Sequence, residues 1–230
     1  MKIIFLNVWN AKMEKEISAF LKEQAADTDL FCFQEVGGRA RKLFEKILPD
    51  HRLAAAARKL ADLRDGFAQA TYAAKSLETG DPEVIFGQRR PRCGLALCTP
   101  VRYAGGSLDA VNLHGLAQPG AKLDDPDRLR QSRGLVDFLA KRPGPKIIGG
   151  DFNLMPETES LRMFAANGYR DLIADFKIAT TRNRLAWDKY PGSKQYFSDY
   201  VFVSPEFRAR SFMVPDVEIS DHLPLIVDII

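Results

Sequence analysis

Five short apolar runs in the sequence each lead to polar residues that could do chemistry. The runs are residues 3–6, 30–33, 111–113, 146–148 and 217–219, and the polar residues after them are Asn7, Glu35, His114, Asp151 with Asn153, and Asp221 with His222. Short apolar runs of this kind are typical of buried strands. Ligand sites in α/β proteins commonly form where strands end, so we expect these side chains to share one pocket.

The expected pocket offers carboxylate and amide oxygens, which are the ligands that magnesium and manganese prefer. No CxxC or Cys/His spacing in the sequence indicates a zinc site. A magnesium ion beside a further carboxylate and histidines suits phosphoester hydrolysis. The metal neutralises the phosphate, a carboxylate orients or deprotonates water, and positive groups stabilise the developing charge.

Two of the motifs carry most of this interpretation. In Gly149-Gly150-Asp151-Phe152-Asn153 the two polar side chains lie on the same side of an extended chain, and the glycines allow close approach of the backbone. The same residues also form ordinary Asx turns, and Ser220-Asp221-His222 could be a turn into the last strand. Their joint occurrence with the other strand ends favours a site.

The elements that must position these residues alternate along the chain. Strands are expected at residues 2–6, 30–33, 94–98, 110–113, 146–148, 200–203 and 225–230, and helices at 13–21, 40–47, 129–139 and 161–165. Residues 54–63 have a helix-prone composition, and residues 67–72 could form a strand. Buried strands mixed with helices indicate an α/β layered fold. Because no break in composition divides the chain, we expect one domain over residues 1–230.

Basic residues gather at three places, residues 88–92, 128–133 and 181–184. Such clusters suit a phosphate-rich ligand, although each could also be a solvated surface. The candidates for contact with substrate phosphates are Arg89, Arg90, Arg182 and Arg184. The net charge of +3 is too balanced to identify a partner by itself.

Composition excludes several classes of protein. A chain of 230 residues that is 46% hydrophobic can bury a core without disulfides, and its apolar runs fall far short of the ~20 residues that span a bilayer. We expect Cys32, Cys93 and Cys98 to be free thiols in a reducing compartment. With no visible secretory segment, the expected location is cytoplasmic, with no membrane insertion and no protein partner predicted.

The motifs, in this order, resemble those of the endonuclease/exonuclease/phosphatase superfamily, which has the deoxyribonuclease I-like fold. The pieces that carry the resemblance are residues 6–10, 33–36, 112–114, 150–153, 198–202 and 220–222, so it covers essentially the whole chain. The resemblance implies an α/β fold with a two-layered mixed β-sandwich flanked by helices on both sides. It also implies a divalent-metal-dependent phosphoesterase.

The resemblance also implies roles for the polar residues. Glu35, with Asn7 and Asp221 nearby, would hold Mg²⁺, for which Mn²⁺ could substitute. Asp151 would position or activate the attacking water, and Asn153 would orient the phosphate.

The histidines would act on the phosphate and the leaving group. His222, held by Asp199, resembles the phosphate-stabilising histidine of the family. His114 resembles a second phosphate-contacting histidine and a candidate acid for the leaving group. Histidine suits this work because it can donate a proton near neutral pH.

Two departures weaken a resemblance to the abasic-site repair branch, which usually has Asp at the position of Trp9 and Lys at the position of Gly37. The sequence is closer to the broader phosphodiesterase branches, so we expect a phosphodiester substrate in nucleic acid or a nucleotide-containing molecule. A phosphomonoesterase and a lipid-headgroup (sphingomyelinase-like) phosphodiesterase are the alternatives on the same scaffold. A non-catalytic binding module is disfavoured by the intact polar set.

Overall fold

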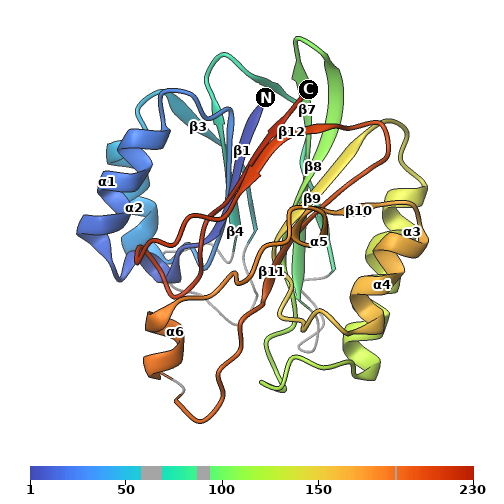
Figure 1. The fold of residues 1–230 in the computed structure, drawn as a ribbon. Coiled ribbons are helices and arrows are strands. Elements are labelled where there is room, and N and C mark those ends of the chain that lie inside the picture. The colour runs from blue at the N-terminus through green and yellow to red at the C-terminus, as the bar shows by residue number, and fades with distance from the viewer. Residues whose placement is uncertain (58–68, 87–93, 190) are drawn as a thin grey trace.

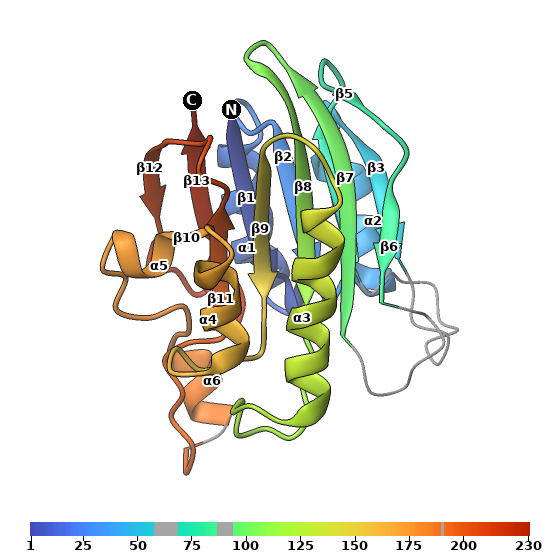
Figure 2. The same cartoon turned by 90° about the vertical axis from the view of Figure 1, so that its right-hand side faces the viewer.

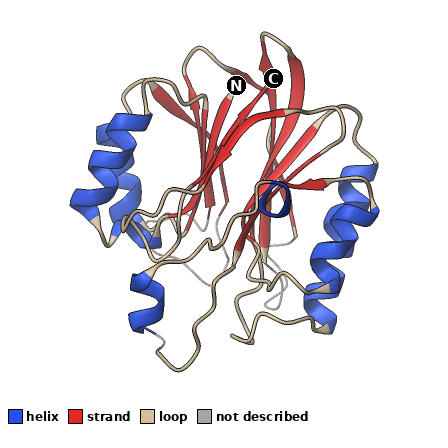
Figure 3. Ribbon diagram, viewed as in Figure 1, coloured by secondary structure: helices blue, strands red, loops and turns tan. Residues whose placement is uncertain are grey.

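Two β-sheets lie face to face, and helices cover the outer face of each sheet (Figures 1 and 3). The computed structural model describes residues 1–57, 69–86, 94–189 and 191–230. The arrangement confirms the predicted α/β fold, a two-layered mixed β-sandwich with helices on both sides.

The first sheet has six strands in the order β12-β13-β1-β2-β4-β3. Strands β1 and β2 are parallel, and the other neighbours are antiparallel. The bounds are β1 Lys2–Asn7, β2 Leu30–Gln34, β3 His51–Ala57, β4 Gln69–Ala74, β12 Ala209–Met213 and β13 Leu225–Ile229.

The second sheet has seven strands in the order β10-β11-β9-β8-β7-β5, with β6 also paired to β7. Only β8 and β9 are parallel among these described pairs. The bounds are β5 Glu78–Thr79, β6 Glu83–Ile85, β7 Leu95–Tyr103, β8 Gly106–His114, β9 Lys146–Asp151, β10 Arg170–Asp171 and β11 Asp199–Val203.

Helices α1 and α2 cover the first sheet, and Figure 2 shows α3 and α4 in front of the second. The bounds are η1 Trp9–Ala11, α1 Glu14–Gln24, α2 Gly38–Ile47, α3 Pro126–Ala140, α4 Glu159–Ala166, α5 Leu172–Asp175 and α6 Arg184–Lys189. Within the described residues, none of the helices has the length and apolar character that crossing a bilayer requires.

The alternation of side chains along β1 explains why the strand is buried on both faces. Ile3 and Phe5 pack in the core shared with the second sheet, whereas Ile4 and Leu6 pack in the core that includes residues of α1 and α2. Successive residues of a strand point to opposite faces, so an unbroken apolar run is needed where both faces are covered. The apolar run at the start of the chain therefore fits a central strand.

A buried polar link joins the two sheets. Asn112 on β8 accepts a hydrogen bond from Gln34 Nε2 at 2.7 Å, and its backbone carbonyl accepts one from Gln69 Nε2 at 2.8 Å. Asn112 in turn donates to the backbone carbonyl of Phe33 at 3.1 Å. Because buried amides are costly unless they are bonded, these contacts favour one relative placement of the sheets.

The pairing register brings the predicted strand ends together. His114 on β8 pairs with Asp151 on β9, and Asp151 pairs with Asp199 at the start of β11. Residues paired across strands project from the same face of a sheet. Asn7 and Gln34 end the neighbouring strands β1 and β2 of the first sheet. These ends lie away from the two chain termini (Figure 1).

The structure corrects parts of the predicted secondary structure. Residues 54–57, expected to be helix-prone, belong to strand β3, and residues 58–63 lie outside the described part. Pairing with β4 overrides the helix propensity of the alanines here. Within the predicted strand 67–72, the described residues 69–72 lie in β4, whereas residues 217–219 are not a strand. The short elements β5, β6, β10, α5 and α6, and strand β12, were not predicted because they carry little periodic signal.

Replacing Gly150 with alanine should destabilise the fold more than replacing Gly144. Both glycines have positive φ, +127° and +78°, so both substitutions strain the backbone, by about 1–2 kcal/mol. A Cβ at Gly150 would lie 2.3 Å from the backbone oxygen of Leu113, whereas nothing lies within 4 Å of one at Gly144. Urea unfolding of Gly150→Ala and Gly144→Ala measures the difference, and equal losses would contradict the close packing of β8 and β9.

Candidate active site

The carboxylate of Asp151 lies at the end of β9 and is only 2% exposed. Its Oδ1 accepts hydrogen bonds from the Ser198 hydroxyl at 2.5 Å and from the backbone N–H of Asn153 at 3.0 Å. Its Oδ2 accepts one from Asn7 Nδ2 at 3.1 Å. The two oxygens therefore have separate sets of partners.

The Oδ2 side of Asp151 faces two histidines. Nε2 of His114 lies 3.8 Å and Nε2 of His222 lies 3.7 Å from this oxygen. Both distances exceed a hydrogen bond. The predicted site residues His114, Asp151 and His222 are thus brought together around one carboxylate oxygen.

Burial of Asp151 opposes its ionisation. The neighbouring His222 and Lys122, and then His114, act in the other direction and outweigh the burial. The Ser198 hydroxyl adds to their effect, so the pKa of Asp151 lies below its ordinary value. Asp151 is therefore an ionised hydrogen-bond acceptor near neutral pH.

Glu35 follows β2 and lies beside Asn7. Asn7 Nδ2 donates to Glu35 Oε1 at 3.2 Å, and Asn7 Oδ1 accepts from the backbone N–H of Trp9 at 3.1 Å. The Glu35 side chain is 42% exposed, so its oxygens are accessible from solvent. Its backbone has φ +55°, a left-handed conformation that non-glycine residues rarely adopt and that is often found at functional sites.

The donor set on this side fits a hard divalent cation. Glu35 and Asp151 each place a carboxylate oxygen against the NH₂ group of Asn7, while the Asn7 carbonyl oxygen accepts from the backbone N–H of Trp9. Magnesium is bound in proteins by one or two carboxylates and retains several waters. These residues could therefore hold Mg²⁺ or Mn²⁺, with Glu35 the most accessible ligand.

His222 and Asp199 form a buried pair. Nδ1 of His222 lies 2.9 and 3.0 Å from the two Asp199 oxygens. Burial, and then the Arg182 guanidinium, lowers the pKa of His222 to about 4, while burial and the Asp151 carboxylate raise the pKa of Asp199. Because Arg182 can only donate and bonds Nε2, the proton of the neutral ring lies on Nδ1 and is donated to Asp199.

Arg182 bonds the other ring nitrogen of His222, Nε2. Its Nη1 donates to Nε2 of His222 at 2.8 Å, and its Nη2 lies 3.4 Å from Asp221 Oδ2. The residue is 8% exposed and forms an isolated β-bridge with His222. The Arg182 guanidinium is therefore a fixed positive charge held between His222 and Asp221.

Asp151, Asp199 and His222 also meet the geometric requirement for a metal site, since one ligand atom from each lies within 4.8 Å of the others. In the structure, however, both ring nitrogens of His222 have partners. A metal at His222 would have to displace Asp199 or Arg182. The structure favours the Glu35 side for the cation.

The remaining predicted residues that the structure describes, Asn153 and Arg184, have different surroundings. Asn153 donates from Nδ2 to the backbone oxygen of Gly115 at 3.3 Å, beside Asp151. Arg184 is exposed, and its guanidinium bonds Glu218 at 2.9 and 2.8 Å and Asp188 at 2.7 Å. These contacts give its predicted role in substrate binding no support. Arg89 and Arg90 lie outside the described residues.

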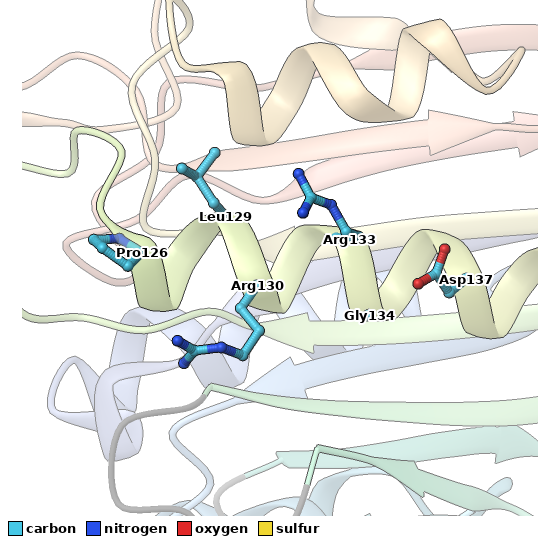
Figure 4. Close-up of a pocket in the computed structure, with 6 residues that line it drawn as sticks. All are labelled: Pro126, Leu129, Arg130, Arg133, Gly134 and Asp137. Carbon is cyan, nitrogen blue, oxygen red and sulfur yellow. The ribbon is translucent and has the colours of Figure 1, made fainter.

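The basic cluster at residues 128–133 divides into a buried Arg128 and two arginines at the surface. Arg128 is 1% exposed, and its guanidinium donates to backbone carbonyls of the loop before α3. These carbonyls belong to Leu116, Pro119 and Leu123. Arg130 bonds Asp127 at 2.5 Å and, with Arg133, lines an open groove of about 450 Å³ along α3 (Figure 4).

Two side chains at the site were not predicted to act there. Ser198 appeared in the motif before Asp199, but its hydroxyl was given no role. Lys122 is 7% exposed and donates from Nζ to Ser198 Oγ at 2.6 Å. It lies in a loop without periodicity, so no sequence signal marks it.

A profile of the Endonuclease/Exonuclease/phosphatase family matches residues 5–222. The chain belongs to this family. Members of the family are hydrolases that act on phosphoester bonds and typically depend on a divalent metal. The match confirms the predicted family and includes the segments that carry Glu35, Asp151 and His222. No match is found among curated proteins.

Solved structures share the fold along the whole chain. An endonuclease/exonuclease/phosphatase from Bacteroides vulgatus has a TM-score of 0.75 and 17% identity, with 100% of this chain and 98% of that chain covered. Humanized D. rerio TDP2 has a TM-score of 0.77 and 16% identity over 100% and 98%. The Bacteroides thetaiotaomicron mannosyl-6-phosphatase has a TM-score of 0.73 and 17% identity over 100% and 99%.

Removing the two arginines that lie close in sequence should have very different effects on stability. Arg182→Met leaves the buried Asp221 without its guanidinium partner, which should cost about 3–5 kcal/mol. Arg184→Met removes only exposed ion pairs, which solvent screens, and should change the stability far less. Thermal unfolding compares the two variants, and similar midpoints would contradict a buried role for Arg182.

Proposed function

We propose that this chain is a divalent-metal-dependent phosphodiesterase that hydrolyses a phosphodiester in nucleic acid or in a nucleotide-containing substrate. The observation that carries the proposal is that the two carboxylate oxygens of Asp151 have different partners. Its Oδ1 is held by Ser198 and Asn153, while its Oδ2 faces Asn7, His114 and His222. One oxygen is anchored and the other is directed to the place where a phosphate and a water would meet.

In this proposal, Asp151 Oδ2 accepts a hydrogen bond from the attacking water and takes its proton as the water oxygen bonds to phosphorus. The bond between phosphorus and the leaving oxygen breaks, and His114 donates a proton to that oxygen. The low pKa of Asp151 keeps it ionised before the attack. Nε2 of His114 lies 3.8 Å from Asp151 Oδ2, too far for a hydrogen bond, so the ring is near the reacting oxygen without being tied to it.

Arg182 stabilises the negative charge that develops on the phosphate. Its guanidinium carries a fixed positive charge and is oriented by Nε2 of His222 and by Asp221. Asp199 holds the opposite nitrogen of His222, so the ring cannot rotate away. Preorganised charge of this kind is commonly the largest contribution to catalysis of phosphoester hydrolysis.

Glu35 and Asn7, with Asp151 beside them, would hold the divalent cation. When bound, the cation supplies Lewis-acid stabilisation of phosphate charge. Glu35 would contact it most directly, because the carboxylate is accessible while Asn7 and Asp151 are buried. In this structure Asn7 links the two carboxylates by donating to both, so its amide would have to turn before Oδ1 could face the cation.

One aromatic ring, Trp9, and two lysines beside it favour a nucleic acid or nucleotide substrate. Trp9, two residues after Asn7, has Lys12 Nζ 3.9 Å and Lys189 Nζ 5.1 Å from its ring centroid. Lys189 also lies 4.0 Å from Asp221. Rings stack on bases and lysines pair with phosphates, so such a rim suits a nucleotide chain. A D. rerio TDP2 structure of the same fold is complexed with single strand DNA product.

Asp151→Asn should abolish turnover without unfolding the protein. The amide keeps the shape of the carboxylate but cannot take a proton, so we expect kcat to fall about 100- to 10,000-fold. Hydrolysis is measured with and without Mg²⁺ on single- and double-stranded DNA, abasic DNA, RNA, a phosphotyrosyl-DNA conjugate, a phosphomonoester and sphingomyelin.

Asp171→Asn is the control, because Asp171 is a half-buried aspartate that lies at the start of α5, away from the site residues named above. It should retain wild-type turnover. Full activity of Asp151→Asn would contradict the mechanism. Turnover of only the phosphomonoester or sphingomyelin would replace the nucleic acid substrate with one of those classes.

Magnesium should stabilise the wild-type protein through Glu35. A ligand that binds only the folded state at 100 times its Kd adds about 2.7 kcal/mol, which raises the melting temperature. Glu35→Gln should lose most of this rise, whereas Glu23→Gln on α1 should keep it. Differential scanning calorimetry with Mg²⁺ and with EDTA checks this, and an undiminished rise in Glu35→Gln would place the cation elsewhere.

A further inference from the structure

A buried chain of hydrogen bonds leads from a loop lysine to Asp151. Lys122 Nζ donates to Ser198 Oγ at 2.6 Å, and the Ser198 hydroxyl donates to Asp151 Oδ1 at 2.5 Å. All three residues are buried, with 7% of Lys122 and 2% of Asp151 exposed. Lys122 therefore reaches the catalytic carboxylate only through Ser198 among the contacts described.

The chemistry of the groups fixes the direction of this chain. The ionised Asp151 carboxylate can only accept, so the single proton of Ser198 points to Asp151 Oδ1. The Ser198 oxygen is then available as an acceptor, which Lys122 fills with one of its N–H groups. Without Lys122, the hydroxyl would be free to rotate away from Asp151.

The loop that carries Lys122 is held in an unfavourable backbone conformation. Lys122 has φ +57°, which is rarely adopted by residues with a Cβ. Its backbone oxygen accepts from the N–H of Met155 at 2.9 Å. Buried Arg128 bonds carbonyls on both sides of it, at Pro119 and Leu123. These contacts together hold the loop in the position from which Lys122 bonds Ser198.

We propose that Lys122 and Ser198 are positioning residues for the reaction. They hold Oδ1 of Asp151 so that Oδ2 faces the attacking water. The inference rests on the proposed function, in which Asp151 acts on water. Neither residue touches the substrate, so their loss slows the chemical step and leaves substrate binding intact.

The far end of the same strands provides matched controls. There Lys146 is also buried, 8% exposed, and its backbone N–H donates to the hydroxyl of buried Ser204 at 2.8 Å. Lys146 and Ser204 sit at the opposite ends of β9 and β11 from Asp151 and Ser198. Lys146→Met and Ser204→Ala therefore remove similar buried groups from the same strands without touching the site.

The test measures kcat and KM on the panel substrate that wild type hydrolyses fastest. Lys122→Met and Ser198→Ala should each lower kcat about 10- to 100-fold, with KM changed less than about twofold. Ser198→Thr, which keeps the hydroxyl, should recover most of kcat. Because Lys122 acts through Ser198, the double variant Lys122→Met/Ser198→Ala should be no slower than Ser198→Ala alone.

A second measurement does not depend on activity. ¹⁵N NMR of the lysine ammonium groups should show a slowly exchanging signal that disappears in Lys122→Met and shifts in Ser198→Ala. Lys146→Met should leave this signal unchanged. A signal unaffected by Ser198→Ala would overturn the contact on which the inference depends.

The kinetic outcomes separate this inference from the proposed function. If Asp151→Asn is inactive while Lys122→Met and Ser198→Ala retain kcat like the two controls, only the positioning role fails. Losses that multiply in the double variant would also overturn it, because the two residues would then act independently. If Asp151→Asn is active, both proposals fail.

Discussion

A buried carboxylate must have donors for both oxygens, and this requirement at Asp151 organises the site. One oxygen is bonded by Ser198 and Asn153 within the second sheet, and the other by Asn7 from the first sheet. Because a charge in a 2% exposed position is costly unless it is bonded, each of these contacts contributes to stability as well as to geometry. The side of Asp151 that remains open is the side that faces the histidines.

The two sheets contribute different kinds of side chain to the open side of Asp151. The first sheet brings Asn7 and Glu35, which suit a cation, and the second brings His114 and Asp199 in register with Asp151. The buried Gln34–Asn112 contact joins the sheets directly beside these ends. A change in the relative placement of the sheets would therefore separate the cation side from the phosphate side. Left-handed backbone at Glu35 and Asn153 shows that local strain is tolerated here, as is common at functional sites.

Much of this site could be predicted from the sequence, since apolar runs that end in Asn7, Glu35, His114 and Asp151 mark strand ends directly. The resemblance of the motifs predicted the sandwich and the pairing of His222 with Asp199, which spacing alone could not. Long-range contacts were harder. Arg128 looked like part of a basic surface because burial does not show in composition, and residues 54–57 looked helical because alanine favours a helix until a partner strand is present.

The central claim is that the cation and Asp199–His222 lie on different sides of Asp151. Crystals soaked in Mn²⁺ would test it most directly, by anomalous diffraction at the manganese absorption edge. We expect a peak beside Glu35 and Asn7, with His222 still bonded to Asp199 and Arg182. A peak within the Asp151, Asp199 and His222 group, with Arg182 displaced, would contradict the division of the site and the role of Asp151 in activating water.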